Sequence, residues 1–210
     1  MYCQLLLVVV AALLRPTHGH PTNPAEDGRV AKRCGTTVAY TNVYLLNELS
    51  PDDIFDVSSD PLFEVAQAEG PINRTYTAVV FPPTPPGAEN CQLWFDLGPV
   101  VPFETNTGAN EVEVRQLIGL GSADEYRASW NRFVEAEPPV TGLVSGNVTL
   151  VPGENKVVNT YTCSNTPDGN GLIFLFQLAD AVEQLGLAAN VSFPLNATSR
   201  VTNIGIDYGC

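Results

Sequence analysis

Histidine, methionine and lysine are almost absent from this 210-residue chain, which holds two, one and two of them. Both histidines, His18 and His20, and the only methionine lie within the first 20 residues. The rest of the chain therefore cannot build a Ser-His-Asp or Cys-His catalytic centre, or a zinc or copper site with histidine ligands. No cofactor and no metal is expected.

Basic residues are also scarce, since 10 Lys+Arg stand against 23 Asp+Glu and give a net charge of -13. Nucleic acids and anionic membrane surfaces attract basic patches, so neither is an expected partner. The sequence also contains no G-x-S-x-G motif and no phosphate-binding loop.

Long apolar runs are missing except at the start, where Leu5–Leu14 is an unbroken run of ten residues. Such a run is too short to span a bilayer but has the length of a signal-peptide core. Small residues up to Gly19 offer a cleavage point, so residues 1–19 are predicted to be a signal peptide. The C-terminal residues, Ile206–Cys210, lack the apolar tail of a GPI signal. We expect a secreted protein, extracellular or in a cell wall, with no membrane span and no GPI anchor.

The polar segment 20–33 ends in the dibasic pair Lys32-Arg33 and contains two prolines. This pattern is typical of a pro-segment cut by a dibasic-specific protease; two ordinary surface charges are the alternative. Cleavage would leave residues 34–210, with six basic and 21 acidic residues and a net charge of -15.

Four cysteines remain after that cleavage: Cys34, Cys91, Cys163 and Cys210. An even number in a secreted chain predicts two disulfides, for which three pairings are available. Loop length favours Cys34–Cys91 with Cys163–Cys210, because this pairing closes the shorter loops. Four N-glycosylation sequons, at Asn73, Asn147, Asn190 and Asn196, also fit the secretory route.

The dominant hydrophobic period between Cys34 and Cys210 is two, which predicts β-strands. Three of the sequon asparagines, Asn147, Asn190 and Asn196, fall on the polar faces of these strands. The expected strands are 38–46, 76–81, 91–97, 111–115, 147–150, 156–163, 172–178, 190–196 and 201–208.

The run 172–176 is nearly all apolar and suggests a central strand covered on both faces, and residues 124–133 are expected to be helical. There Tyr126, Trp130 and Phe133 share one face. We predict an all-β antiparallel sandwich, Ig-like or jelly-roll-like, with one short helix. It would form a single domain, 34–210, with residues 34–81 as an N-terminal extension; a boundary at the proline stretch 82–86 is the alternative.

The motifs Val79-Val80-Phe81-Pro82, Cys91-Gln-Leu-Trp-Phe95 and Ile204-Gly-Ile-Asp-Tyr-Gly-Cys210 together suggest a family. Over roughly residues 75–210 the chain resembles the C-terminal domain family named after a fungal ubiquitin 3 binding protein, the But-type domain. The resemblance implies a fungal host and a β fold, and it supplies no catalytic residues. The family name also implies contact with cytosolic ubiquitin-like machinery, which a signal peptide and disulfides oppose.

Trp94 is the candidate sugar-contact residue, because alternation puts it on the strand face opposite Leu93 and Phe95. Burial under a loop or under the 34–81 extension is the alternative and the more common fate of a tryptophan. Asp168-Gly-Asn-Gly171 offers oxygen ligands for calcium but lacks the acid that closes such a loop, so it reads better as a turn.

Carboxylates form several clusters, at Asp52, Asp53 and Asp56, at Glu111 and Glu113, at Asp124-Glu125, and at Glu135 and Glu137. Ser50–Asp53 also resembles a helix start, with the acids in its first turn.

Two functions follow. The preferred one is a secreted fungal N-glycoprotein without catalytic activity, structural or binding, with cell-wall polysaccharide or an extracellular protein as its partner. The alternative is a carboxylate-dependent glycan-active enzyme of the glycoside hydrolase type, which needs two acids facing each other across a cleft.

Overall fold

The computed structural model describes residues 35–70, 72–98, 104–106, 110–118, 128–135, 141–160, 163, 171–179, 183, 186–195 and 202–209. All of them belong to one compact unit, Arg33–Cys210. Several sequence predictions lie outside the described residues: the signal peptide, the dibasic pair Lys32-Arg33, Cys34, Asn196, Cys210 and the Asp168 turn.

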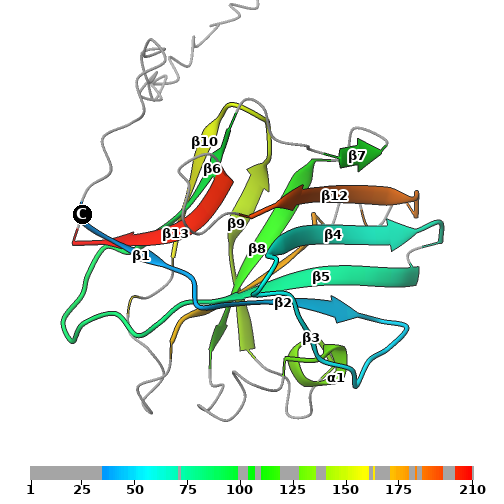
Figure 1. Cartoon of the computed structure of the whole chain (residues 1–210), viewed down its shortest axis with the longest axis horizontal. Helices are drawn as coiled ribbons and strands as arrows, with labels where there is room; N and C mark the ends of the chain where they lie inside the picture. The colour runs from blue at the N-terminus through cyan, green and yellow to red at the C-terminus, as the bar shows by residue number, and fades with distance from the viewer. Residues whose placement is uncertain are drawn as a thin grey trace, which may run out of the picture. The chain divides into compact units, whose positions relative to one another are not determined.

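Two sheets, in which every strand pair is antiparallel, make up the described fold (Figure 1). The smaller has the order β1 (Thr36–Ala39), β13 (Thr202–Tyr208), β6 (Gln92–Leu97) and β10 (Asn155–Asn159). The larger has the order β7 (Glu104–Asn106), β12 (Ala189–Pro194), β4 (Leu62–Ala68), β5 (Ile72–Val80), β11 (Ile173–Leu178), β8 (Glu111–Ile118) and β9 (Thr141–Thr149). A further strand, β2 (Asn42–Asn47), pairs with β5, and β3 (Phe55–Asp56) pairs with β2. The predicted all-β antiparallel class is confirmed.

The main core lies between the two sheets, because the alternating apolar residues of each sheet point at the other. Leu93, Phe95 and Leu97 of β6 are buried, as their spacing predicts. Phe95 meets Phe176 of β11 edge-to-face, with ring centroids 5.6 Å apart. This contact spans the gap between the sheets and defines the sandwich.

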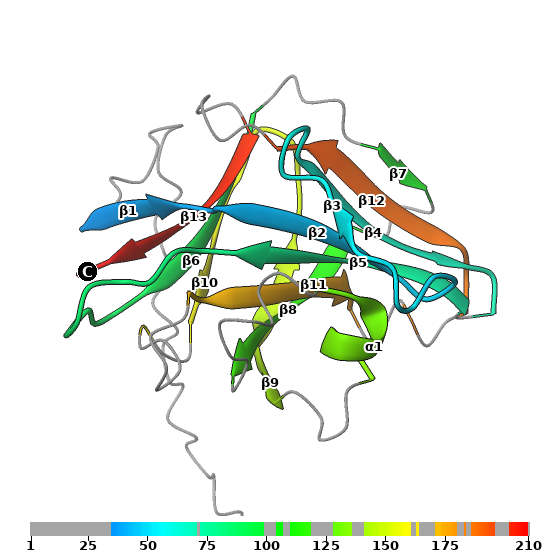
Figure 2. The same ribbon diagram turned by 60° about the horizontal axis from the view of Figure 1, so that its bottom comes forward.

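β11 is buried on both faces, as its continuous apolar sequence predicts. Its inward residues join the main core, while Ile173 and Leu175 join a second cluster on the outer face of the larger sheet. α1 (Trp130–Phe133) lies beside the larger sheet (Figure 2), and its Trp130 and Phe133 side chains belong to this second cluster.

Within the described residues the helix is shorter than the predicted segment 124–133, and Ser129 caps its start by accepting a hydrogen bond from the Arg132 backbone N–H. None of the helices described has both the length and the apolar character needed to cross a membrane.

The larger sheet branches along one edge of β5. In the β4–β5 ladder, Ala68 pairs with Ile72 and Ala66 pairs with Thr75. From Thr77 onward β5 pairs with β11 instead. At the branch the hydroxyl of buried Thr77 accepts from the Glu64 backbone N–H at 2.9 Å and donates to the Glu64 carbonyl at 2.6 Å. The side chain thus satisfies two backbone groups that the diverging strands leave unpaired.

The segment 34–81 supplies strands β1 to β5 and is therefore built into both sheets rather than packed on a finished sandwich. The predicted strand 38–46 is in fact two strands, β1 in the smaller sheet and β2 in the larger one. Between them lie Tyr40 and Thr41, and the Thr41 backbone N–H donates to the Val80 carbonyl where the chain crosses over.

The favoured disulfide pairing is wrong. The structure joins Cys91 to Cys163, with Cα atoms 5.3 Å apart and a sequence separation of 72. Strand pairing overrides loop length here, because antiparallel pairing of β6 with β10 brings Cys91 beside the end of β10, close to Cys163. Both cysteines are buried in the main core.

The first prediction concerns this bond. A Cys91→Ala/Cys163→Ala double variant should lose about 2–5 kcal/mol of unfolding free energy. The unfolded chain has more conformational entropy when the disulfide no longer closes this long loop. Urea denaturation of the variant and of the oxidised wild type measures the difference. Equal stability would show that closing this loop contributes nothing to the fold.

Candidate functional site

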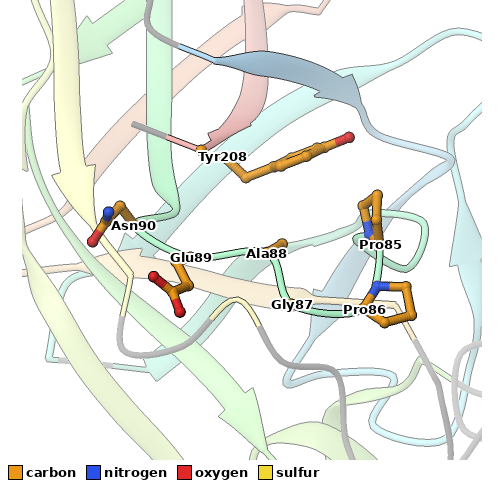
Figure 3. A pocket seen from close by; sticks show the side chains of 8 residues that line it. Pro85, Pro86, Gly87, Ala88, Glu89, Asn90 and Tyr208 are labelled. Carbon is orange, nitrogen blue, oxygen red and sulfur yellow. The ribbon is translucent and has the colours of Figure 1, made fainter.

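A shallow, open pocket of about 530 Å³ lies where the proline-rich loop after β5 meets the end of β13. Figure 3 shows the Tyr208 ring extended across the loop, with its hydroxyl end on the side of Pro85 and with Glu89 and Asn90 at the other side. The lining residues are Pro85, Pro86, Gly87, Ala88, Glu89, Asn90, Tyr208 and Gly209.

Several bonds hold the loop of this pocket in place. Buried Thr84 donates its hydroxyl to the Cys163 carbonyl at 2.5 Å, and the disulfide fixes Cys91 at the other end of the loop. The Gly209 backbone N–H donates to the Glu89 carbonyl at 2.9 Å. The pocket is therefore preorganised, which lowers the entropy cost of binding a ligand there.

The lining offers a defined chemistry. Ala88 and Tyr208 pack partly against the main core, which fixes the ring, while Glu89 and Asn90 are exposed. An aromatic face beside a carboxylate and an amide suits a ligand with both apolar and hydroxyl-bearing surfaces. Asn90 has φ 54°, a left-handed conformation that asparagine tolerates better than most residues and that turns the chain into β6.

Trp94 does not reach this pocket and is buried, with 5% of its surface exposed. Its indole N–H donates to the Asp207 carboxylate at 3.0 Å, and Asp207 also accepts from the Thr37 hydroxyl at 2.6 Å. The structure thus corrects the candidate sugar contact, because the indole has no open face on which a sugar ring could stack.

Gly205 explains how the indole fits on this strand face. Gly205 lies directly opposite Trp94 in the β13–β6 register. A Cβ atom on Gly205 would lie 2.2 Å from the indole Cζ2 atom. The missing side chain leaves the space into which the ring folds.

The sequon asparagines differ in accessibility. Asn73 and Asn147 are exposed, and Asn147 donates its amide to the Glu111 carboxylate at 3.2 Å. Asn190 is half-buried, because β12 lies between β4 and β7 and its register pairs this residue with both neighbours. Asn73 and Asn147 thus present their side chains most openly.

The acidic clusters of the sequence are dispersed in the structure. Asp52 accepts from the Asn131 amide at 2.8 Å, and Asp56 caps a turn by binding the Ser58 backbone N–H. Ser50–Asp53 forms a turn and not the helix start that the sequence suggested. These acids tie loops together.

The remaining clusters are split in the same way. Glu113 is 5% exposed and binds Arg115 and Gln177, whereas Glu111 faces Asn147. Glu135 accepts from the Trp130 indole, while Asp124, Glu125 and Glu137 lie outside the described residues. Among the residues the structure describes, no three His, Cys, Asp or Glu side chains gather closely enough to hold a metal ion.

A charged cluster that the sequence analysis missed centres on Arg74 of β5. Its guanidinium binds Glu48 and Glu183, each at 2.8 Å, and lies 5.0 Å from the Trp130 ring centroid. The hydrogen bonds from Arg74 hold the pKa of Glu48 below its ordinary value, against the opposing effect of burial. Burial and the nearby Glu183 carboxylate raise the pKa of Tyr76, whose hydroxyl meets Glu183 at 3.1 Å.

Two signals could have pointed to these sites. Arg74 is one of only six basic residues beyond Arg33, so pairing with acids from distant segments was to be expected. Asn90-Cys91 and Tyr208-Gly-Cys210 each put pocket residues next to a cysteine, which marks both segments as tethered.

Comparison with known proteins adds no relative: no protein-family model matches the chain, and no curated protein matches its sequence.

The second prediction tests the Arg74 cluster. Arg74→Met should cost about 1–3 kcal/mol near pH 7, after allowing for solvent screening of the exposed part of the pair. The folded-state pKa of Glu48 is depressed, so this stabilisation is present above the ordinary glutamate pKa and is lost as pH falls through the folded value. Urea denaturation near pH 7 and at about pH 3 should show the variant and wild type converging in acid.

Lys156→Met is the matched control, since Lys156 pairs with Glu154 at 2.6 Å on a more exposed surface. It should change stability by less than about 1 kcal/mol. A constant gap between Arg74→Met and wild type at both pH values would contradict the role given to Glu48.

Proposed function

We propose that this chain is a secreted fungal N-glycoprotein without catalytic activity, which binds a wall polysaccharide through the Tyr208 pocket. The observation that carries the proposal is the fixed Tyr208 ring facing a tethered loop that presents Glu89 and Asn90. A cell-wall or extracellular location follows from the signal-peptide pattern at Leu5–Leu14.

A neutral polysaccharide is the ligand class that this chemistry favours. The C–H face of a sugar ring can pack on Tyr208 and the adjacent prolines, while Glu89 and Asn90 exchange hydrogen bonds with its hydroxyls. The net charge of -13 repels polyanions and leaves neutral glycans as the better match.

Binding is better supported than hydrolysis at this pocket. Glycoside hydrolysis uses two carboxylates across the scissile bond, whereas among the described residues the pocket lining contains one, Glu89. Glu48, Glu183 and Glu113 are each held in ion pairs with arginine elsewhere on the fold. The glycan-active enzyme alternative therefore has less support among the described residues than binding does.

The secretory route is supported by the Cys91–Cys163 bond and by the exposed sequons at Asn73 and Asn147. Disulfides persist in oxidising compartments, so a buried disulfide fits poorly with the cytosolic ubiquitin-like contacts that the But-type resemblance implies. The resemblance therefore supports a fungal host and a β fold, and not a cytosolic role.

The third prediction concerns the second disulfide. With Cys91 and Cys163 paired, Cys34 and Cys210 are the remaining cysteines of 34–210. The β1–β13 register pairs Thr36 with Tyr208, each two residues from one of these cysteines. Non-reducing peptide mapping of secreted protein should recover a Cys34–Cys210 linked peptide. Free thiols at both positions would contradict the second disulfide.

The fourth prediction tests the ligand site. On an array of glucan, chitin and mannan oligosaccharides, the protein should bind at least one class, and Tyr208→Leu should weaken that binding about tenfold, or about 1.4 kcal/mol. Leucine keeps the apolar packing but removes the flat ring and its hydroxyl. Phe55→Ala removes an exposed aromatic ring on β3 and should leave binding unchanged.

Two results would overturn the site. Equal binding by wild type and Tyr208→Leu would remove the pocket as the ligand site. Failure of the wild type to bind any polysaccharide would remove the lectin role and leave a structural role or a protein partner.

A further inference from the structure

Three large apolar side chains are exposed at one end of the larger sheet. Leu49 is 68% exposed, and Ile72 and Leu187 are each 52% exposed. We call these three residues the apolar rim. Single exposed apolar residues are ordinary, but three at one end of a sheet offer apolar surface that a covering group can shield.

Backbone hydrogen bonds place the rim around Asn73. Ile72 precedes Asn73 in β5, and the Glu48 N–H donates to the Arg74 carbonyl at 3.0 Å, so that Leu49 follows at the same level of the sheet as Asn73. On the other side, the Gly70 N–H donates to the Gly186 carbonyl at 2.8 Å, which brings the residue before Leu187 to the β4–β5 turn. The rim residues thus come from three segments that meet at this end of β5.

The conformation of Asn73 suits a surface attachment point. Its φ of 55° is left-handed, and the residue is exposed at a point where the β4–β5 register is irregular. The next residue, Arg74, is fixed by ion pairs to Glu48 and Glu183. A group carried by Asn73 therefore starts from a rigid base.

We propose that an N-glycan on Asn73 covers the apolar rim. The inference rests on the proposed function, because it requires passage through the secretory pathway. There the donor is a lipid-pyrophosphate oligosaccharide: Asn73 Nδ2 bonds to the anomeric carbon, the carbon–oxygen bond to pyrophosphate breaks with its electron pair going to the pyrophosphate, and the amide releases one proton.

A glycan is the occupant that best fits this surface. Sugar rings are amphipathic, so their C–H faces can lie on Leu49, Ile72 and Leu187 while their hydroxyls stay in water, much as a lysine stem covers apolar surface. The attachment point lies among the rim residues, so covering them costs no association entropy. A second copy of the chain would need a matching apolar surface and would lose translational and rotational freedom on association.

The Asn147 sequon provides an internal comparison. Asn147 is also exposed, but its amide binds Glu111 and its register partner is Glu113. The side chain that it contacts is a carboxylate, so removing a glycan there should uncover little apolar area.

The fifth prediction is tested with the full chain secreted from a eukaryotic host. Thr75→Ala removes the Asn73 sequon and leaves Asn73 itself in place. Thr75→Ser keeps the sequon, because serine also satisfies its third position, and it is a substitution of similar size at the same residue. Thr149→Ala and Thr149→Ser make the same pair at Asn147. Intact mass and glycopeptide mapping establish occupancy, and an apolar-surface dye with light scattering measures exposure and self-association.

Thr75→Ala should raise dye binding about twofold or more over Thr75→Ser, while the Thr149 pair should show no such difference. Enzymatic deglycosylation of folded wild type should reproduce the rise, which guards against a folding defect in the variant. Leu49→Ser in the Thr75→Ala background should reverse most of it.

The failures are distinguishable. A secreted protein without any glycan would overturn the proposed glycoprotein and this inference together. Glycans at other sequons but none at Asn73 would overturn the inference alone. Equal dye binding with and without a mapped Asn73 glycan would do the same, and concentration-dependent dimers of the glycosylated protein would assign the rim to a second copy.

Discussion

Burial of β11 on both faces is the constraint on which the rest of the described fold depends. Phe174 and Phe176 point into the gap between the sheets, where Phe176 meets Phe95 of the opposite sheet. Ile173 and Leu175 point the other way and would face water if the larger sheet were left bare. The chain therefore needs a second cover on that side, and the short α1 supplies it with the side chains of Trp130 and Phe133.

This cover also explains the position of the Arg74 cluster. Tyr76 lies against Trp130, with ring centroids 4.8 Å apart, so the edge of the outer apolar layer is aromatic. Arg74 stands at that edge over the Trp130 ring and closes it with ion pairs to Glu48 and Glu183. A guanidinium in that position can contact the aromatic faces and also pair with acids from two loops. The Arg74 side chain thereby links α1, the residue after β2 and the segment before β12. These ion pairs of Arg74 also hold the chain directly after Asn73.

The hydrophobic pattern of the sequence predicted correctly which residues of a single strand are buried. It did not predict features that depend on how strands distant in the sequence pair with each other. The alternation of Leu93, Phe95 and Leu97 and the continuous run of β11 were read correctly, because each reports the burial of its own strand. The switch between sheets near Tyr40, the Cys91–Cys163 bond and the burial of Trp94 against Gly205 all depend on register between strands, which composition and spacing do not encode. β4 alternates as cleanly as β6 and was overlooked, so that omission is not a limit of the sequence.

Parts of both sheet faces are covered by other side chains of the described fold. α1 occupies the outer face of the larger sheet at β11, and on the smaller sheet Trp94 folds down over Gly205 and is hydrogen-bonded to Asp207. The proposed ligand contacts come from a loop and a strand end, where side chains remain exposed and the backbone is held from within the sandwich. The proposed ligand site and the proposed glycan site both lie on such segments. The loop of the Tyr208 pocket is tethered through Cys91–Cys163, and the chain next to Asn73 is held by the ion pairs of Arg74. Two different anchors, one covalent and one ionic, thus hold the proposed ligand site and the proposed glycan site at separate ends of one core.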